Sequence, residues 1–203
     1  SGDYCDLLDH GDSLYFVVGD VSGKGVAAAM LMATARGILR CRCQESGTLA
    51  DLLNNMNDLL VEDTGGERFM TMLLMTIDAV NGQLRWATAG HKPPFAYDKD
   101  SDRFIQLEGS GYPLGLMSDI SYDEYSFDSV KTGQVYVAST DGIWESVDPK
   151  GEMFGINRLR ELIRRYAHLP AVQISKRISN DLEEFRGGSK QSDDIAFVVV
   201  KVL

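Results

Sequence analysis

Three turns in the sequence carry aspartates that are suited to binding a metal ion. They are GDVSGKG at 19–25, Thr140-Asp141-Gly142 and Ser192-Asp193-Asp194, and each lies where an apolar, strand-like run begins or ends. Mg²⁺ and Mn²⁺ prefer oxygen ligands, and one turn supplies too few of them, so carboxylates gathered from distant strand ends are what such ions require. We therefore interpret the sequence as that of a metal-dependent enzyme.

Each turn is weak support for a metal site when it is taken alone. Gly-Asp and Asp-Gly turns are common, and Asp20 has a plain alternative role near a helix start, with Gly23 and Gly25 serving only the turn geometry. The pair Asp193 and Asp194 is harder to explain structurally, because adjacent carboxylates repel unless a cation compensates them, although solvent also screens the pair. The order of the turns along the chain decides between the two interpretations.

The runs around these turns predict strands and helices in separate groups. Apolar runs and alternation predict strands at 12–20, 69–78, 83–89, 94–98, 103–107, 121–127, 134–140 and 195–203. Three- and four-residue spacing predicts helices at 25–44, 48–63, 156–167 and 171–185, with a short helix after Asp141. Asn81-Gly82 is a strong hairpin signal. Antiparallel strands and paired helices indicate an α+β layered domain.

Composition narrows the class of partner. The 203 residues, 44% of them hydrophobic, are expected to form one domain. A net charge of −10, from 30 acidic and 20 basic residues, opposes binding to nucleic acid or an anionic membrane. No apolar run approaches the ~18 residues that span a bilayer, and no signal peptide is found. The odd cysteine count, without framework spacing, favours reduced thiols and a cytoplasmic protein over a disulfide framework. A zinc site is disfavoured because no second Cys/His pair accompanies Cys41 and Cys43.

Seven short motifs follow one another in a fixed order. They are Gly2-Asp3-Tyr4 with Asp6, GDVSGKG at 19–25, AGHKPP at 89–94, GYPLG at 111–115, STDG at 139–142, Phe154-Gly155, and Asp193-Asp194-Ile195. In this order the chain resembles the metal-dependent protein phosphatases (PPM family), in the branch of the bacterial stage II sporulation protein E, over essentially its whole length.

The resemblance implies a four-layer α-β-β-α sandwich of two antiparallel sheets flanked by helix pairs. The chain departs from the family at its start, because the family strand before Gly2-Asp3-Tyr4 is absent and Ser1 stands where glycine is usual. We interpret residues 1–203 as a single phosphatase domain, truncated at its N-terminus and cut from a larger signalling protein.

The resemblance also implies a set of site residues. Two Mn²⁺ or Mg²⁺ ions are expected to be bridged by Asp20, with the Val21 carbonyl on one ion and Asp141 and Asp193 as the other protein ligands. Asp3 is expected to hold a metal-bound water, and Asp194 to orient a neighbouring group. Two such ions activate a shared water that attacks phosphorus directly, so no nucleophilic Ser or Cys is needed.

Three further residues are open to two interpretations each. The eukaryotic branch has a histidine as general acid where this chain has Ser22, so a metal-bound water is the preferred proton donor here. Lys24 is a candidate for binding substrate phosphate, although an exposed lysine at a helix start is the safer reading. His91 is a second candidate for substrate binding, but before Lys92-Pro93 it is better explained as shaping a turn.

The implied function is a phosphoserine/phosphothreonine protein phosphatase that acts on a signalling protein of the anti-sigma-factor-antagonist type. An upstream sensor or receiver domain, as in two-component regulation, is implied as a partner, and a homodimer is possible. A non-catalytic adaptor or pseudophosphatase is the alternative, which the presence of Asp20, Asp141 and Asp193 disfavours. A metal-dependent hydrolase of small phosphate esters shares the chemistry and stays open.

Overall fold

The structure is a computed structural model that describes residues 2–10, 13–78, 81–191 and 193–203. In this part of the chain, nine strands form two antiparallel sheets accompanied by five helices. The chain divides into two compact units, Ser1–Pro93 with Glu108–Val130, and Pro94–Leu107 with Lys131–Leu203. We describe each unit by itself.

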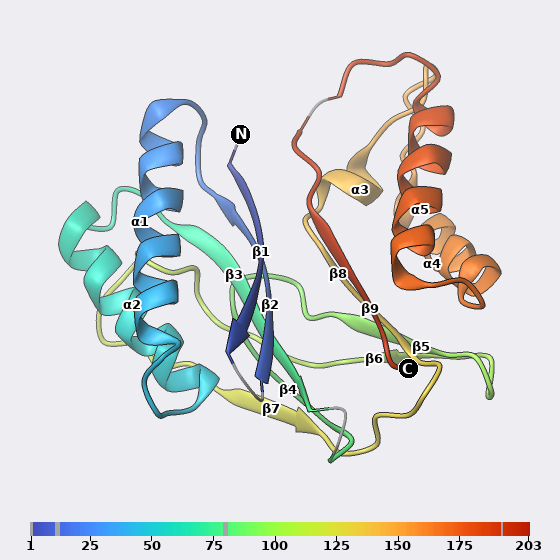
Figure 1. The fold of residues 1–203 in the computed structure, drawn as a ribbon. Coiled ribbons are helices and arrows are strands. Elements are labelled where there is room, and N and C mark those ends of the chain that lie inside the picture. Colours follow the sequence, from blue (N-terminus) through green and yellow to red (C-terminus); the bar gives the residue numbers. More distant parts are fainter. Residues whose placement is uncertain (1, 11–12, 79–80, 192) are drawn as a thin grey trace. The chain divides into compact units, whose positions relative to one another are not determined.

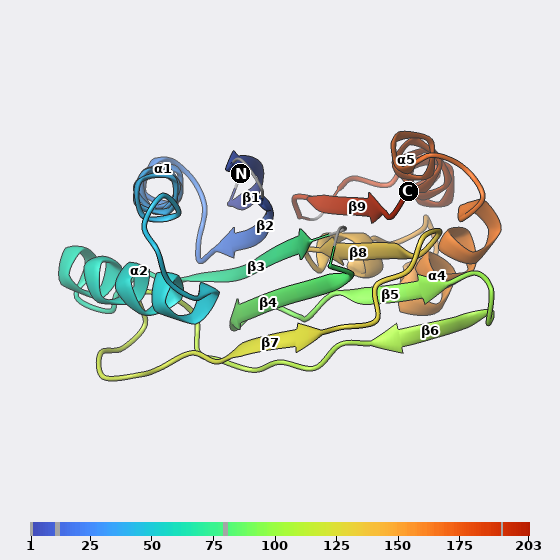
Figure 2. The same cartoon turned by 60° about the horizontal axis from the view of Figure 1, so that its bottom comes forward.

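The first unit contains the five-stranded sheet. Its strand order is β1-β2-β3-β4-β7, for β1 (Asp3–His10), β2 (Ser13–Val21), β3 (Met70–Asp78), β4 (Gln83–Ala89) and β7 (Glu124–Phe127). Two helices, α1 (Val26–Arg42) and α2 (Leu49–Thr64), lie side by side next to this sheet (Figures 1 and 2).

The core of the first unit lies between its sheet and the two helices. Side chains alternate along β2, so Val17 and Val21 join this core while Asp20 points to the other face. α1 contributes residues at three- and four-residue spacing, which places them on one face of the helix: Ala28, Leu31, Ala35 and Leu39. α2 begins at a capping box made by Thr48 and Asp51.

The second unit contains the four-stranded sheet. Its strand order is β6-β5-β8-β9, for β5 (Phe95–Asp98), β6 (Arg103–Gln106), β8 (Val135–Ser139) and β9 (Phe197–Lys201). The helices are α3 (Gly142–Glu145), α4 (Gly155–Tyr166) and α5 (Ala171–Arg186). Buried residues of α4 and α5 pack with β8 to form its core: Leu159, Ile163, Ile174, Ile178, Val135 and Val137.

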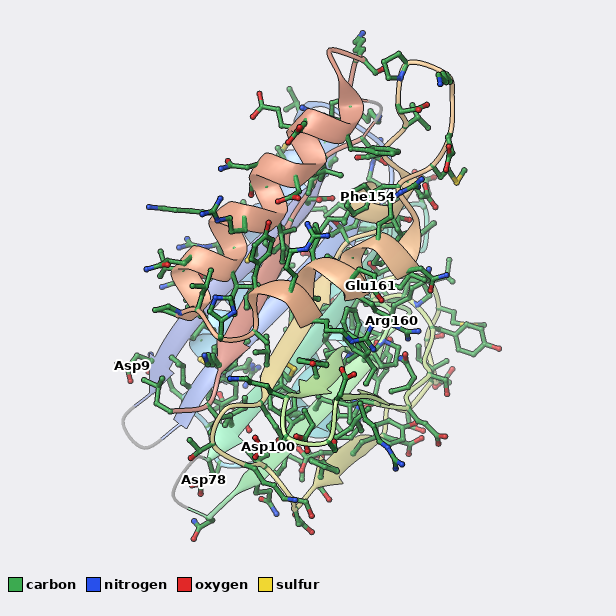
Figure 3. All side chains as sticks on the ribbon, turned by 90° about the vertical axis from the view of Figure 1, so that its right-hand side faces the viewer. Asp9, Asp78, Asp100, Phe154, Arg160 and Glu161 are labelled. Carbon is green, nitrogen blue, oxygen red and sulfur yellow. The ribbon has the colours of Figure 1, made fainter. Side chains whose placement is uncertain are left out.

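Arginines of α4 extend that packing to the edge of the sheet. The Arg160 guanidinium lies 5.7 Å from the centroid of the Phe95 ring and 5.6 Å from that of Phe104, which are cation–π distances. Figure 3 labels Arg160 beside Glu161 on this helix, with Phe154 just before the helix start. The long side chains of α4 therefore cover apolar rings of β5 and β6.

The predicted α+β class, with two antiparallel sheets and helix pairs, is confirmed. The four long helices and seven of the predicted strands begin and end within two residues of their predicted bounds. β7 is shorter than predicted, because it begins at Glu124 rather than at 121. None of the helices in the described residues is long and apolar enough to cross a membrane.

β1 is the element that the sequence did not predict. Its inward-facing positions are Tyr4, Asp6 and Leu8, so a charge interrupts the apolar alternation that marks a strand. The structure compensates this charge through arginines of α1, since Asp6 accepts hydrogen bonds from Arg36 at 3.2 Å and from Arg40 at 2.7 Å. The partners are thirty or more residues away, which no local pattern shows.

Candidate metal-binding site

Asp20 lies at the end of β2, between two polar neighbours on the adjoining strands. Its direct partners in the sheet are Asp3 of β1 and Thr71 of β3. Side chains of directly opposite residues share one face of the sheet, so the two carboxylates lie next to each other. Like charges in such a pair are destabilising, and a bound cation would offset their repulsion.

Gly2 lies against the two atoms that the sequence predicted as metal ligands in this unit. The Val21 N–H donates a hydrogen bond of 3.1 Å to the Gly2 carbonyl. A Cβ on residue 2 would be 2.8 Å from the Val21 carbonyl oxygen and 3.0 Å from Asp20 Oδ1. Only glycine allows this approach without displacing both oxygen atoms, which explains the glycine before Asp3.

The turn after Val21 is held by a reciprocal pair of hydrogen bonds. Ser22 N–H donates to the Phe69 carbonyl at 2.9 Å, and Phe69 N–H donates to Ser22 Oγ at 3.1 Å. Gly23 and Gly25 follow with φ of 86° and 85°, the left-handed region that favours glycine. Ser22 therefore fixes the turn, and Lys24 is exposed between the two glycines.

In the second unit, the turn at Asp141 connects β8 to α3. Thr140 is buried and donates from its N–H to the Ala196 carbonyl at 2.9 Å, while Ala196 N–H donates to Thr140 Oγ1 at 3.0 Å. Asp141 occupies the N-cap of α3, yet its carboxylate makes no capping hydrogen bond. The exposed Asp141 carboxylate is thus held at the strand end without serving the helix start.

Gly142 brings the second and third aspartate turns together. A Cβ on this residue would lie 1.9 Å from the Asp194 carbonyl oxygen, a distance that real Cβ atoms do not show. The neighbouring Asp193 is exposed, and its Oδ1 accepts the Asp194 N–H at 3.0 Å. Backbone atoms of Asp194 therefore support both turns, while Ser192 lies outside the described residues.

His91 is buried near the first turn. Its Nδ1 is 3.0 Å from Thr71 Oγ1, and its carbonyl accepts a hydrogen bond of 2.5 Å from Thr88 Oγ1. Its exposed fraction is 8%, which supports the structural role that the sequence favoured. The contact with Thr71 also places the ring beside the strand partner of Asp20, and a role in substrate binding stays a prediction.

The donor set has the chemistry that a hard cation requires. Each unit places two predicted carboxylates at neighbouring turns or strands, Asp3 with Asp20 and Asp141 with Asp193. The described residues contain no group of three or more His, Cys, Asp or Glu side chains that converges on one point. Because oxygen atoms alone are offered, the residues fit Mg²⁺ or Mn²⁺ rather than a softer metal.

Sequence reasoning missed the residues that hold the carboxylates in place. Gly2, Gly142 and Thr140 were noted only as parts of motifs, whereas the structure shows the close approaches and hydrogen bonds that they make. A glycine next to an aspartate was the available signal. This signal does not distinguish a glycine that a turn requires from a glycine that another part of the chain approaches closely.

Comparisons with known proteins agree on the family. A family described as "Stage II sporulation protein E (SpoIIE)" matches residues 10–203. Phosphoserine phosphatase RsbU of Bacillus subtilis is 25% identical over 99% of this chain, and Protein IcfG of Synechocystis sp. is 30% identical over 98% of it. The chain spans 59% and 36% of the lengths of these two relatives.

Solved structures share the fold of this chain. The SiaA-PP2C domain of Pseudomonas aeruginosa superimposes with a TM-score of 0.85 over 98% of this chain and 80% of that chain, at 22% identity. The PP2C phosphatase domain of SpoIIE from Bacillus subtilis gives 0.82 over 100% and 58%, at 19% identity. RsbX in complex with magnesium gives 0.74 over 100% and 87%, at 15% identity. These likenesses confirm the fold.

Proposed function

The chain belongs to the stage II sporulation protein E (SpoIIE) family, and on that premise we propose that it is a metal-dependent phosphatase acting on phosphoserine or phosphothreonine of a protein. The observation that supports this most directly is the contact between Gly142 and Asp194, since it joins two carboxylate-bearing turns that are fifty residues apart in sequence. A relative of 25% identity carries the name phosphoserine phosphatase.

We propose the following ligands for two Mn²⁺ or Mg²⁺ ions: Asp20, the Val21 carbonyl, Asp141 and Asp193. When bound, such ions lower the pKa of a water and neutralise the charge of a phosphate. Gly2 keeps the Val21 and Asp20 oxygens free of a competing side chain, and Thr140 fixes the strand end that carries Asp141. Asp3 is proposed to hold a metal-bound water, and Asp194 to orient a neighbouring group.

Two side chains near the first aspartate turn are poorly suited to act as a nucleophile. Ser22 Oγ accepts the Phe69 N–H and belongs to the turn itself. Burial raises the pKa of the Cys5 thiol, and repulsion from Asp6 and Asp3 raises it further, which opposes formation of a reactive thiolate. These observations support direct attack by water, with no covalent intermediate on the protein.

We further propose that the substrate is a phosphorylated signalling protein of the anti-sigma-factor-antagonist type, controlled by a sensor or receiver domain. The relatives are longer than the matched region, and one solved structure of 27% identity is described as the RsbU and RsbW domains of Rv1364c from Mycobacterium tuberculosis. Another includes a fragment of a regulatory domain beside the phosphatase domain. A cytoplasmic location and a homodimer belong to the same proposal.

Phosphate release from a phosphoserine protein in Mn²⁺ tests the function. Replacing a metal ligand should lower kcat/KM at least about 100-fold, so we expect this loss in Asp20→Asn, Asp141→Asn and Asp193→Asn. Asp119→Asn is the matched control, because Asp119 is exposed and the charge change is the same. A native chain that releases no more phosphate than these variants would favour the adaptor, and faster hydrolysis of p-nitrophenyl phosphate than of phosphoprotein would favour a small-ester hydrolase.

A further inference from the structure

Arg68 is held beside the glycine turn that follows the candidate ligands Asp20 and Val21. The two hydrogen bonds between Ser22 and Phe69 continue the pairing of β2 and β3 past the end of both strands. Because Arg68 directly precedes Phe69, its backbone is fixed next to this turn. It is the nearest arginine in sequence to the start of β3 and played no part in the motifs.

The guanidinium of Arg68 reaches over Gly23. Among the described residues other than its chain neighbours, Arg68 Nη1 would lie nearest to a Cβ on Gly23, at 3.5 Å. The missing side chain at residue 23 therefore leaves room for the guanidinium to lie against the turn. Gly23 is two residues after Val21, whose carbonyl is a proposed ligand, so the positive charge of Arg68 lies close to this part of the proposed metal site.

This guanidinium has no partner among the described residues, in contrast to most other arginines of the chain. Described ion pairs engage Arg36, Arg40, Arg42, Arg85, Arg158 and Arg164. Arg68 takes part in a hydrogen bond through its backbone carbonyl, which accepts from Thr64 Oγ1 at 3.2 Å. In a chain of net charge −10, an arginine without an acidic partner is available for an anion from outside.

Space for such an anion borders Arg68. A hollow of about 310 Å³ between α1 and α2 is lined by Arg68, Ala27, Met30, Leu31, Thr34, Asp63 and Thr64. Its α1 side is mostly apolar, and Met30 is 66% exposed. Asp63 is the one acidic residue in this lining, and it forms no ion pair with Arg68 in the described part of the chain. Among the described residues that line the hollow, Arg68 alone carries a positive charge.

We propose that Arg68 binds the phosphoryl group of the substrate, as a specificity-determining residue beside the metal ligands. A guanidinium presents its donors in a planar fork that matches two oxygens of one phosphate, which a lysine ammonium does not. The hydrogen bonds between Ser22 and Phe69 hold the backbone beside Arg68 next to the glycine turn. This inference rests on the proposed phosphatase function and adds a residue that the sequence motifs did not indicate.

Inorganic phosphate, the reaction product, is the probe for this site. Calorimetric titration of the Mn²⁺-loaded chain gives its dissociation constant, and competitive inhibition of phosphoprotein hydrolysis gives its inhibition constant. Because a hydrogen bond to a charged group contributes about one to two decades in affinity, Arg68→Gln should raise both constants about tenfold or more. Arg68→Lys should recover part of this loss. Mn²⁺ affinity should stay within about twofold of native.

Arg103→Gln is the matched control, since Arg103 is exposed on β6 and loses the same charge. Its phosphate affinity should equal that of the native chain. Equal phosphate affinity in Arg68→Gln and Arg103→Gln would overturn the proposal, as would a parallel loss of Mn²⁺ affinity in Arg68→Gln, which would make Arg68 a support of the turn. If the native chain hydrolyses no phosphoprotein, the proposed function fails, while the calorimetric comparison still decides the role of Arg68.

Discussion

Gly142 and Gly37 both lie in helices, but replacing them by alanine should change the free energy of unfolding in opposite directions. A Cβ at residue 142 would meet the Asp194 carbonyl at 1.9 Å, whereas nothing lies within 4 Å of one at residue 37. Gly142→Ala should therefore lower the free energy of unfolding by about 2–3 kcal/mol through overpacking. Gly37→Ala should raise it by about 0.5–1 kcal/mol, because alanine restricts the unfolded chain.

Urea denaturation of the native chain and both variants measures these changes. Gly142→Ala should also weaken Mn²⁺ binding, because the shift would displace the turn that carries Asp193. Gly37→Ala should leave Mn²⁺ binding unchanged. If Gly142→Ala unfolds at the native urea concentration, the contact between the two turns does not support the site.

The sequence indicates the candidate site residues one by one, but it does not indicate the contacts that hold them in place. Asp20, Asp141 and Asp193 drew attention because each stands where an apolar run begins or ends, and their roles as ligands stay predictions. The features that hold them, such as the Gly2 approach to Val21 and the Thr140 hydrogen bonds, join residues that are far apart in sequence. Residue types without context cannot show such pairs, so Arg68 was also missed.

At the scale of elements, one partly buried carboxylate, that of Asp6, connects β1 to α1. Asp6 accepts hydrogen bonds from Arg36, Arg40 and the Tyr4 hydroxyl. Burial alone would raise the pKa of Asp6, but hydrogen bonds from Arg40, Tyr4 and the Leu7 N–H outweigh it, so the pKa lies below its usual range. Because Asp3 is on the same strand, this contact also holds one predicted site residue to the helix after Val21.

Removing this charge should lower the stability by an amount that depends on pH. A lowered folded pKa stabilises the protein above the unfolded pKa of about 3.9, and this contribution is lost as pH falls through the folded pKa. At pH 7, the free energy of unfolding of Asp6→Asn should be about 1 kcal/mol lower than that of the native chain. The loss is this small because both arginines are partly exposed. The difference should shrink below pH 4.

Urea denaturation between pH 7 and pH 3 follows this difference. Asp9→Asn, an exposed change on the same strand, should show no comparable loss at pH 7. A deficit of Asp6→Asn that is constant down to pH 3 would show that packing, not charge, holds β1. The same charge explains why β1 escaped prediction while α1, α2, α4 and α5 did not: helix periodicity is local, whereas an inward-facing aspartate on a strand depends on arginines of another element.

For the whole molecule, the dominant property is an excess of negative charge. Because the net charge is −10, any added cation should stabilise the folded state nonspecifically by screening the repulsion between its negative charges. A specific site must therefore be distinguished from general screening. The sequence predicted the fold class from its apolar patterns and the excluded classes of partner from this net charge. The proposed ligand set depends on a few placed oxygens, which the net charge does not reveal.

Thermal unfolding with Mn²⁺ separates the two effects. A ligand that binds only the folded state, present at about 100 times its dissociation constant, stabilises it by about 2.7 kcal/mol, which corresponds to a rise in Tm of roughly 5–10 °C for a chain of this size. NaCl of equal ionic strength should raise Tm less, because it acts by screening alone. Asp20→Asn should lose most of the Mn²⁺ effect and keep the NaCl effect, whereas Asp119→Asn, with the same net charge, should keep both. Equal stabilisation of these two variants by Mn²⁺ would mean that the ion acts on the overall charge, and that Asp20 is not a ligand.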